Sequence, residues 1–83
     1  MEERVLYIIK NIIRKGHKVT LKSRLHEDLN IDTVDMLMII ADLEEEFSTT
    51  IADNEFDDAV TVNDVVEKLI DRGITDLTGQ PIF

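Results

Sequence analysis

Two acidic runs in the chain have the alternating oxygen spacing with which a calcium-binding loop begins: Asp28-x-Asn30-x-Asp32 and Asp53-x-Glu55-x-Asp57. An EF-hand loop also needs Gly at its sixth position and a bidentate Glu at its twelfth. The first run has Thr33 and Ile39 at these positions, and the second has Asp58 and Asp64. The runs therefore do not predict an EF-hand site, although weak, nonspecific binding of divalent ions would relieve self-repulsion on an acidic surface.

The histidines do not form a convincing metal site either. His17 and His26 lie in one predicted loop without paired spacing, and the chain contains no Cys, so we interpret both as surface residues. The sequence shows no nucleophile with a neighbouring base and no pair of carboxylates that must face each other across an apolar cleft. We therefore predict that the protein is not an enzyme and has no metal cofactor.

The spacing of apolar residues predicts one all-α domain, a small four-helix bundle over residues 1–72, followed by a tail over residues 73–83. The predicted helices cover Glu2–Lys15, Asp32–Phe47, a short segment at Asp53–Asp58, and a last helix from Thr61 to Gly73. Asp32 and Thr61 are suitable N-caps, while Gly16 and Gly73 suit helix C-termini. Tails of this composition are usually frayed, but Ile82 and Phe83 could dock on a groove or a partner.

Each predicted helix has one face for a common core. In the first helix this face consists of Val5, Leu6, Ile8, Ile9, Ile12 and Ile13. In the second it consists of Met36 or Leu37, Ile40, Leu43 and Phe47. The short helix contributes Phe56, and the last helix contributes Val62, Val65, Val66, Leu69 and Ile70. A long loop over residues 17–30 is predicted to be held to the core by Val19, Leu21, Leu25 and Leu29.

Charge is distributed unevenly along the chain. Residues 1–24 contain seven Lys or Arg and two Glu, a balance of +5, while residues 25–83 contain two Lys or Arg and sixteen Asp or Glu, a balance of -14. The acidic part repels phosphate backbones and favours basic protein surfaces, so we do not expect nucleic acid as a partner. The sequence shows neither a signal peptide nor a membrane span, which predicts a cytoplasmic protein that we expect to be a monomer.

The order of these elements resembles that of the acyl carrier protein family over residues 2–71. The most specific stretch is Asp28-Leu29-Asn30-Ile31-Asp32-Thr33-Val34-Asp35, followed by Leu43-Glu44-Glu45-Glu46-Phe47. A second block, Ile51-Ala52-Asp53 and Ala59-Val60-Thr61-Val62, has the family's spacing for a short third helix and the start of the fourth. The resemblance implies a four-helix bundle of acyl-carrier type with a long first loop.

The resemblance also implies a phosphopantetheine group attached at Thr33. The family attaches this group to Ser in a G-x-D-S-L signature at the head of the second helix, and the chain has Asn30, Asp32, Thr33 and Val34 where the signature has Gly, Asp, Ser and Leu. A phosphodiester at a helix N-terminus is stabilised by unsatisfied amides and the helix dipole. Thr keeps the hydroxyl, but its methyl group makes the alcohol secondary and restricts its rotamers, so attachment should be hindered.

Two readings of Thr33 therefore remain open. It carries the prosthetic group, or it is a first-turn residue whose hydroxyl hydrogen-bonds locally within a non-carrying interaction module. In the first reading, cargo is expected to shelter between helices among residues such as Ile40, Ile51 and Val62.

The family docks on partner enzymes through outward carboxylates of the second helix, which implies a docking surface in this chain. Its predicted residues are Val34, Asp35, Met38, Asp42, Glu44, Glu45 and Glu46. Met38 stands where the family usually has an acid, and an apolar residue there would alter partner choice. The implied partners are basic surfaces of synthase, acyltransferase and phosphopantetheinyl transferase enzymes of fatty-acid, lipid or secondary-metabolite synthesis, with an acyl group as the cargo.

Overall fold

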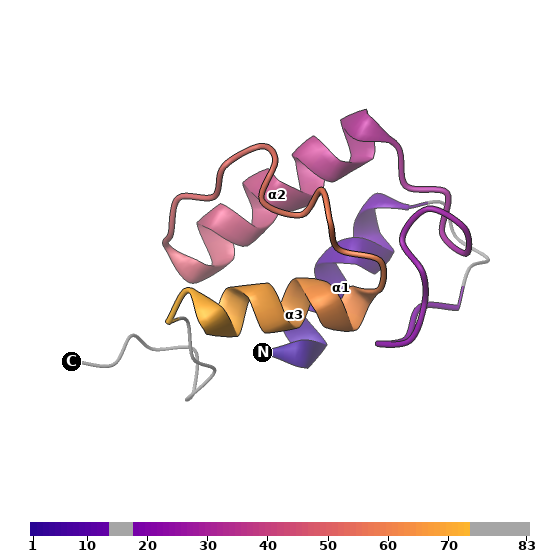
Figure 1. Ribbon diagram of the computed structural model, residues 1–83, viewed down its shortest axis with the longest axis horizontal. Helices are drawn as coiled ribbons and strands as arrows, with labels where there is room; N and C mark the ends of the chain where they lie inside the picture. Colours follow the sequence, from indigo (N-terminus) through magenta and orange to yellow (C-terminus); the bar gives the residue numbers. More distant parts are fainter. Residues whose placement is uncertain (14–17, 74–83) are drawn as a thin grey trace.

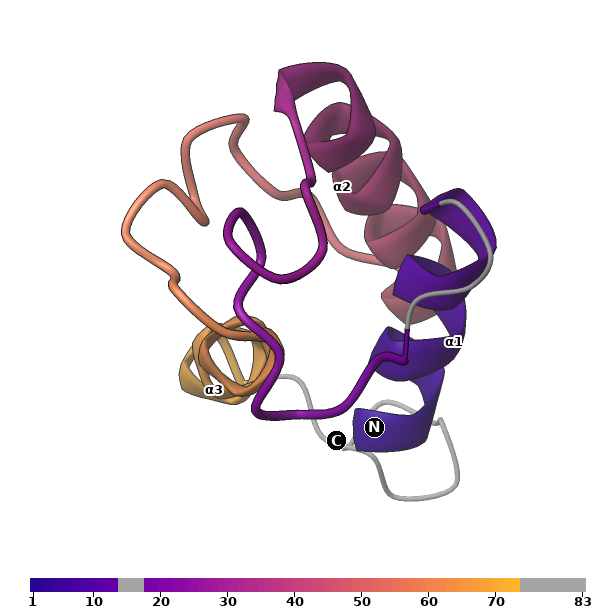
Figure 2. The same ribbon diagram turned by 90° about the vertical axis from the view of Figure 1, so that its right-hand side faces the viewer.

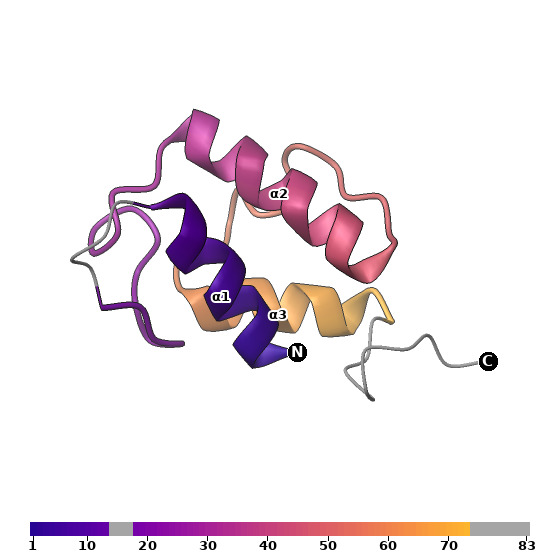
Figure 3. The same cartoon turned by 180° about the vertical axis from the view of Figure 1, so that it is seen from behind.

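The computed structural model in Figure 1 describes residues 1–13 and 18–73 of the chain. Within these ranges it contains three α-helices: α1 (Glu2–Ile12), α2 (Thr33–Phe47) and α3 (Val62–Asp71). Helix α1 packs against both α2 and α3, and Figure 3 shows it in front of α3 and beside α2. The all-α class is thus confirmed for the part of the chain that the structure describes.

One apolar core joins the three helices and the loops between them. The side chains with less than 2% exposure are Val5, Ile9, Leu25, Ile39, Leu43, Val62, Val65, Val66 and Leu69. Most of them belong to the predicted helix faces. Ile39 was not predicted, and its burial shows that the inward face of α2 is centred on Ile39, Ile40 and Leu43.

Helix α1 is shorter than its apolar pattern predicts. It ends at Ile12, because the next residue, Ile13, has the extended backbone angles φ -79° and ψ 165°. The Ile13 side chain is nevertheless buried. The apolar residue that the pattern assigned to the helix therefore reaches the core from an extended segment. Lys15 and the predicted cap Gly16 lie outside the described residues.

The first loop is held to the core as predicted. Val19, Leu25 and Leu29 are buried, and Leu21 packs against the same cluster. The Leu25 amide donates a hydrogen bond of 2.8 Å to the Val60 carbonyl, next to an isolated antiparallel bridge between Arg24 and Thr61. These two contacts join the first loop to the 48–60 segment, and Figure 2 shows the two segments close together beside the start of α3.

The predicted short third helix is not confirmed. Residues 53–58 form successive turns, with hydrogen bonds from Glu55 to Ala52 (3.0 Å) and from Asp57 to Asn54 (3.2 Å). These bonds join residues three apart, and a segment this short leaves little room for the bonds between residues four apart that define an α-helix. Phe56 is buried as predicted. The described residues therefore contain three helices, and residues 53–58 form turns where the fourth was predicted.

Helix α3 begins and ends as predicted, but one of its predicted core residues is exposed. Thr61 caps it in a capping box with Asp64, and Gly73 follows its end with a φ of +89°. Ile70 is 54% exposed, because one residue advances the helix by about 100° and carries position 70 past the edge of the apolar face. Residues 74–83, including Ile82 and Phe83, lie outside the described chain.

Candidate functional site

The start of α2 is fixed by the capping arrangement that the sequence predicts. The Asp32 carboxylate accepts a hydrogen bond of 2.8 Å from the Asp35 amide, and the Asp35 carboxylate accepts one of 3.4 Å from the Asp32 amide. Asp32 itself has an extended backbone, as N-cap residues do. This reciprocal pair sets the direction in which the first turn of the helix leaves the loop.

Thr33 is the first helical residue, and it is exposed. Its hydroxyl forms no hydrogen bond with any described residue, and none of them accepts a hydrogen bond from the amides of Thr33 and Val34. Asp32 already performs the local capping. The hydroxyl thus lies beside two free amides at the positive end of a 15-residue helix, so these residues fit a phosphate-linked group.

Asn30 explains how the chain manages without the Gly of the family signature. Its φ is +55°, which lies in the left-handed region that glycine adopts most easily. Asn is among the few other residues that are enriched in this region. The substitution therefore preserves the sharp turn that brings the loop into Asp32 and the helix.

A surface pocket of about 130 Å³ lies beside Thr33. Its wall includes apolar side chains from α2 and the 53–58 turns, namely Met36, Leu37 and Phe56, and polar side chains, namely His26, Asp32, Asp53 and Asp57. Apolar side chains can contact methyl or methylene groups, and carboxylates can accept hydrogen bonds. The pocket therefore offers complementary contacts to a neutral, amphipathic chain that starts at the Thr33 hydroxyl.

His26 contributes to this pocket in a way that the sequence interpretation missed. Its Nδ1 atom lies 2.8 Å from the Ile31 carbonyl oxygen, and since a carbonyl can only accept, Nδ1 must carry the proton. The ring is thereby held against the backbone two residues before Thr33. Only the contact between loop residues 26 and 31 reveals this role, and no pattern of spacing indicates it.

The exposed face of α2 contains most of the predicted docking residues. Val34 is 64% exposed, and Met38 is 44% exposed. Asp42 and Glu45 are also exposed. Leu37, the predicted core alternative to Met36, is 44% exposed, and Met36 packs against the core instead. The outer face of α2 is thus apolar in its first half and acidic toward its C-terminal end.

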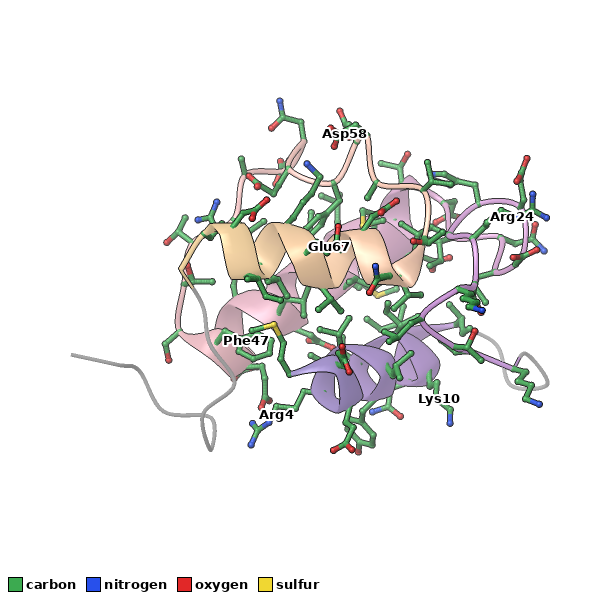
Figure 4. All side chains as sticks on the ribbon, turned by 60° about the horizontal axis from the view of Figure 1, so that its bottom comes forward. Arg4, Lys10, Arg24, Phe47, Asp58 and Glu67 are labelled. Atoms are coloured by element: carbon green, nitrogen blue, oxygen red, sulfur yellow. The ribbon has the colours of Figure 1, made fainter. Side chains whose placement is uncertain are left out.

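Three other predicted docking carboxylates have partners within the protein. Asp35 belongs to the capping box, and Glu44 accepts a hydrogen bond of 2.7 Å from the Ile51 amide. Glu46 forms an ion pair with Arg4 of α1, at the end of the helix pair where Figure 4 labels Arg4 and Phe47. These side chains therefore stabilise the fold as well as adding negative charge.

The residues predicted to shelter the cargo are all in the core. Ile40 is 3% exposed, Ile51 is 4% exposed, and Val62 is fully buried. None of them lines the pocket beside Thr33. Within the described ranges, no cluster of three or more His, Asp or Glu side chains could hold a metal ion. None of the helices described is long and apolar enough to cross a membrane.

Hydrogen bonds lower the pKa of several loop and cap carboxyls. The Val60 and Thr61 amides lower the pKa of Asp64, and the Arg24 amide and guanidinium lower the pKa of Asp28. Lys68 lowers the pKa of Asp58, which lies on the loop over α3 in Figure 4. Each of these contacts favours the ionised carboxylate and holds a loop near the site.

Comparisons with known proteins agree with this geometry. The family model described as phosphopantetheine attachment site matches residues 3–69. The chain is 39% identical to an acyl carrier protein of Borrelia garinii subsp. bavariensis over 59 residues, which are 71% of this chain and 74% of that protein. It is 34% identical to an acyl carrier protein of Phytoplasma australiense over 59 residues, 71% of this chain and 78% of that protein.

A solved structure agrees as well. A proposed acyl carrier protein from Mycobacterium tuberculosis superposes with a TM-score of 0.74 and 28% identity, covering 86% of this chain and 96% of that one. Members of the matched family are carrier proteins and not enzymes. With a matching family model over most of its length and an exposed hydroxyl where the second helix begins, the chain belongs to the acyl carrier protein family.

Proposed function

We propose that this protein carries an acyl group on phosphopantetheine attached to Oγ1 of Thr33. The observation that best supports the proposal is the exposed Thr33 hydroxyl, which has no hydrogen-bond partner among the described residues. If the hydroxyl had only a local structural role, it would be expected to hydrogen-bond to the backbone. When bound, phosphopantetheine would supply the thiol to which an acyl group is joined as a thioester.

The surrounding residues would hold the attachment point in place. Asp32 and Asp35 orient the first turn through their reciprocal hydrogen bonds. The free amides of Thr33 and Val34 would stabilise a phosphodiester charge. Asn30 keeps the left-handed turn before them. These roles follow from the chain's own contacts. They do not require a residue from another part of the protein to bind the phosphate.

The exposed face of α2 is the surface that we propose for partner enzymes. Val34, Leu37 and Met38 would make apolar contacts, while Asp42 and Glu45 would attract Arg and Lys of a partner. The proposed partners are synthase, acyltransferase and phosphopantetheinyl transferase enzymes of fatty-acid, lipid or secondary-metabolite synthesis. We further propose that the protein is monomeric and cytoplasmic.

Intact mass spectrometry of the protein isolated from its native host tests the attachment. We expect a phosphopantetheine-sized mass increment that fragmentation places on Thr33. The matched control is Thr33→Val, which keeps the side-chain shape and removes the hydroxyl. An increment that persists in Thr33→Val would place the group elsewhere and refute the proposed site.

The second candidate is a non-carrying interaction module that keeps the fold and the acidic docking face. The observation in its favour is Thr33 itself, because its secondary alcohol should be a poorer acceptor of the group than Ser. For this candidate, the native protein has its unmodified mass but still binds partners through α2. A Thr33→Val variant would then bind those partners as well as the wild type does.

A further inference from the structure

Two surface pockets meet on one side of the protein, between the first loop and the 53–60 segment. The pocket of about 130 Å³ begins at Thr33, and a neighbouring pocket of about 330 Å³ reaches Val60. His26 and Asp57 line both of them. We call the combined depression the His26 groove, and define it by Thr33, Phe56, Asp57, His26, Ala59 and Val60.

Both sides of the His26 groove are held by hydrogen bonds. On the first-loop side, the His26 ring is bound to the Ile31 carbonyl at 2.8 Å. Across the groove, the Val60 amide donates to the Asp64 carboxylate at 2.8 Å, and the Val60 carbonyl accepts from the Leu25 amide at 2.8 Å. The two loops that form the groove are therefore bound to each other and to α3.

The groove has both apolar and polar side chains along its length. Near Thr33 its apolar contacts are Met36, Leu37 and Phe56. At the other end Ala59 and Val60 lie beside the charged residues Arg24, Glu27 and Asp58. Asp57 is present in both pockets as a hydrogen-bond acceptor. Beyond its phosphate, phosphopantetheine is a neutral chain with two methyl groups, a hydroxyl and two amide N–H donors. The methyl groups of the arm can contact the apolar residues of the groove, and its N–H and O–H donors can hydrogen-bond to the carboxylates.

We propose that the His26 groove holds the phosphopantetheine arm along the outside of the bundle, with the thiol end near Val60. The inference rests on the proposed attachment at Thr33, and it gives a path that differs from the cargo site expected among Ile40 and Val62. Val60 is 56% exposed and therefore accessible, whereas Ile40 and Val62 are only 3% and 0% exposed. Occupying the groove would not require the core to open.

Nuclear Overhauser measurements on the modified protein test the path. After intact mass shows that the protein is fully loaded, we expect cross-peaks from the methyl protons of the arm to the Val60 methyl groups and the His26 ring protons. Cross-peaks to the methyl groups of Ile40, Ile51 or Val62 would overturn the proposal. So would a loaded protein without cross-peaks to the groove residues.

A Thr33→Ser variant separates failure of this inference from failure of the proposed function. If wild-type protein does not acquire the arm, attachment at Thr33 is wrong, but loaded Thr33→Ser still tests the groove. If either loaded protein lacks the Val60 cross-peaks, the proposed path of the arm through the groove is wrong although attachment takes place. The two results are therefore distinguishable.

Substitution of Val60 gives an independent readout. Val60→Thr keeps the branched shape and the backbone hydrogen bonds but removes an apolar contact, so the thiol of the loaded arm should react with a neutral disulfide reagent roughly twofold faster or more. Ile70→Thr is the matched control, because Ile70 is 54% exposed and lies outside both pockets. Equal rates for wild type and both variants would contradict the groove. Thermal melting checks that both variants fold.

Discussion

Thr33 is the residue at which the chemistry of attachment should be most sensitive to one methyl group. Thr33→Ser replaces a secondary alcohol by a primary one in the same first turn, and frees the side-chain rotamer. We expect a phosphopantetheinyl transferase with coenzyme A to modify the Ser variant about tenfold faster or more, since small misplacements of a nucleophile are costly. The measurement is the rate of the mass increase, and Thr33→Val gives the background rate. Equal rates for the wild type and the Thr33→Ser variant would show that the methyl group does not hinder attachment.

Asn30 gives a prediction about stability, because its φ of +55° restricts which residues the position accepts. Asn30→Val places a β-branched side chain in the left-handed region and should lower the free energy of unfolding by about 1–2 kcal/mol. Asn30→Gly should change it by less than about 1 kcal/mol, because glycine adopts this conformation without strain. Urea denaturation of both variants checks the difference. A Val variant as stable as the Gly variant would mean that the turn relaxes.

At the residue scale, the sequence predicts the capping by Asp32, and with it the start of α2 beside Thr33, because capping depends on short-range chemistry. The exposure of Leu37 and the burial of Ile39 were not predicted, since a short apolar run allows the inward face of a helix to rotate by a residue. Only packing against the other helices decides between these orientations. The partner of His26, five residues away in an irregular loop, could not be deduced from spacing.

At the scale of elements, the start of α3 depends on one carboxylate. Asp64 accepts hydrogen bonds from the Val60 and Thr61 amides at 2.8 and 3.1 Å, and these bonds lower its pKa. A carboxyl with a lowered folded-state pKa contributes stability above its unfolded-state pKa, and the contribution is lost as the pH falls through the folded-state pKa. Asp64 therefore stabilises the protein at neutral pH and ceases to do so in acid.

The Asp64→Asn variant tests this dependence. We expect it to be less stable than the wild type at neutral pH, and the difference to shrink as the pH falls to and below the ordinary range of Asp, about pH 4. Chemical denaturation between neutral pH and about pH 2.5 gives the two curves. Glu67→Gln is the control, because Glu67 lies on the exposed side of the same helix. A constant difference in the free energy of unfolding between wild type and Asp64→Asn across this range would contradict the proposed role of the Asp64 carboxylate.

Helix boundaries were predictable where a side chain fixes them and uncertain elsewhere. Asp32 and Thr61 mark the starts of α2 and α3 because each accepts a hydrogen bond from the amide three residues later. The end of α1 has no comparable signal, and the extended backbone of Ile13 satisfies the same demand for burial as another helical turn would. Phe56 can be buried whether residues 53–58 form turns or a helix, so the pattern of apolar residues alone could not distinguish the two.

At the scale of the whole molecule, the groove beside Thr33 depends on contacts between distant parts of the chain. The Leu25 amide and the Val60 carbonyl are far apart in sequence, and their hydrogen bond brings the two loops together. Sequence patterns within either loop carry no information about this pairing. The same holds for the ion pair between Arg4 and Glu46, which links the start of α1 to the end of α2.

The overall charge leads to a prediction about salt. The net charge is -9, and the acidic residues are concentrated after residue 24. Several carboxylates are in ion pairs, including Glu46 with Arg4 and Asp58 with Lys68. Asp42 and Glu45, one turn apart on the exposed face of α2, have no cationic partner among the described residues. Repulsion between unpaired carboxylates should therefore lower the stability of the folded state at low ionic strength.

Added salt should raise the melting temperature, because it shortens the screening length from about 30 Å at 0.01 M to a few Å near 1 M. An Asp42→Asn, Glu45→Gln double variant removes two of the repelling charges and keeps the side-chain shapes. It should melt at a higher temperature than the wild type at low salt, and its melting temperature should respond less to added salt. Differential scanning calorimetry over this range measures both effects. If the wild type shows no rise, its carboxylates are balanced by cations more completely than the ion pairs indicate, and the acidic face of α2 would then attract basic partners less strongly.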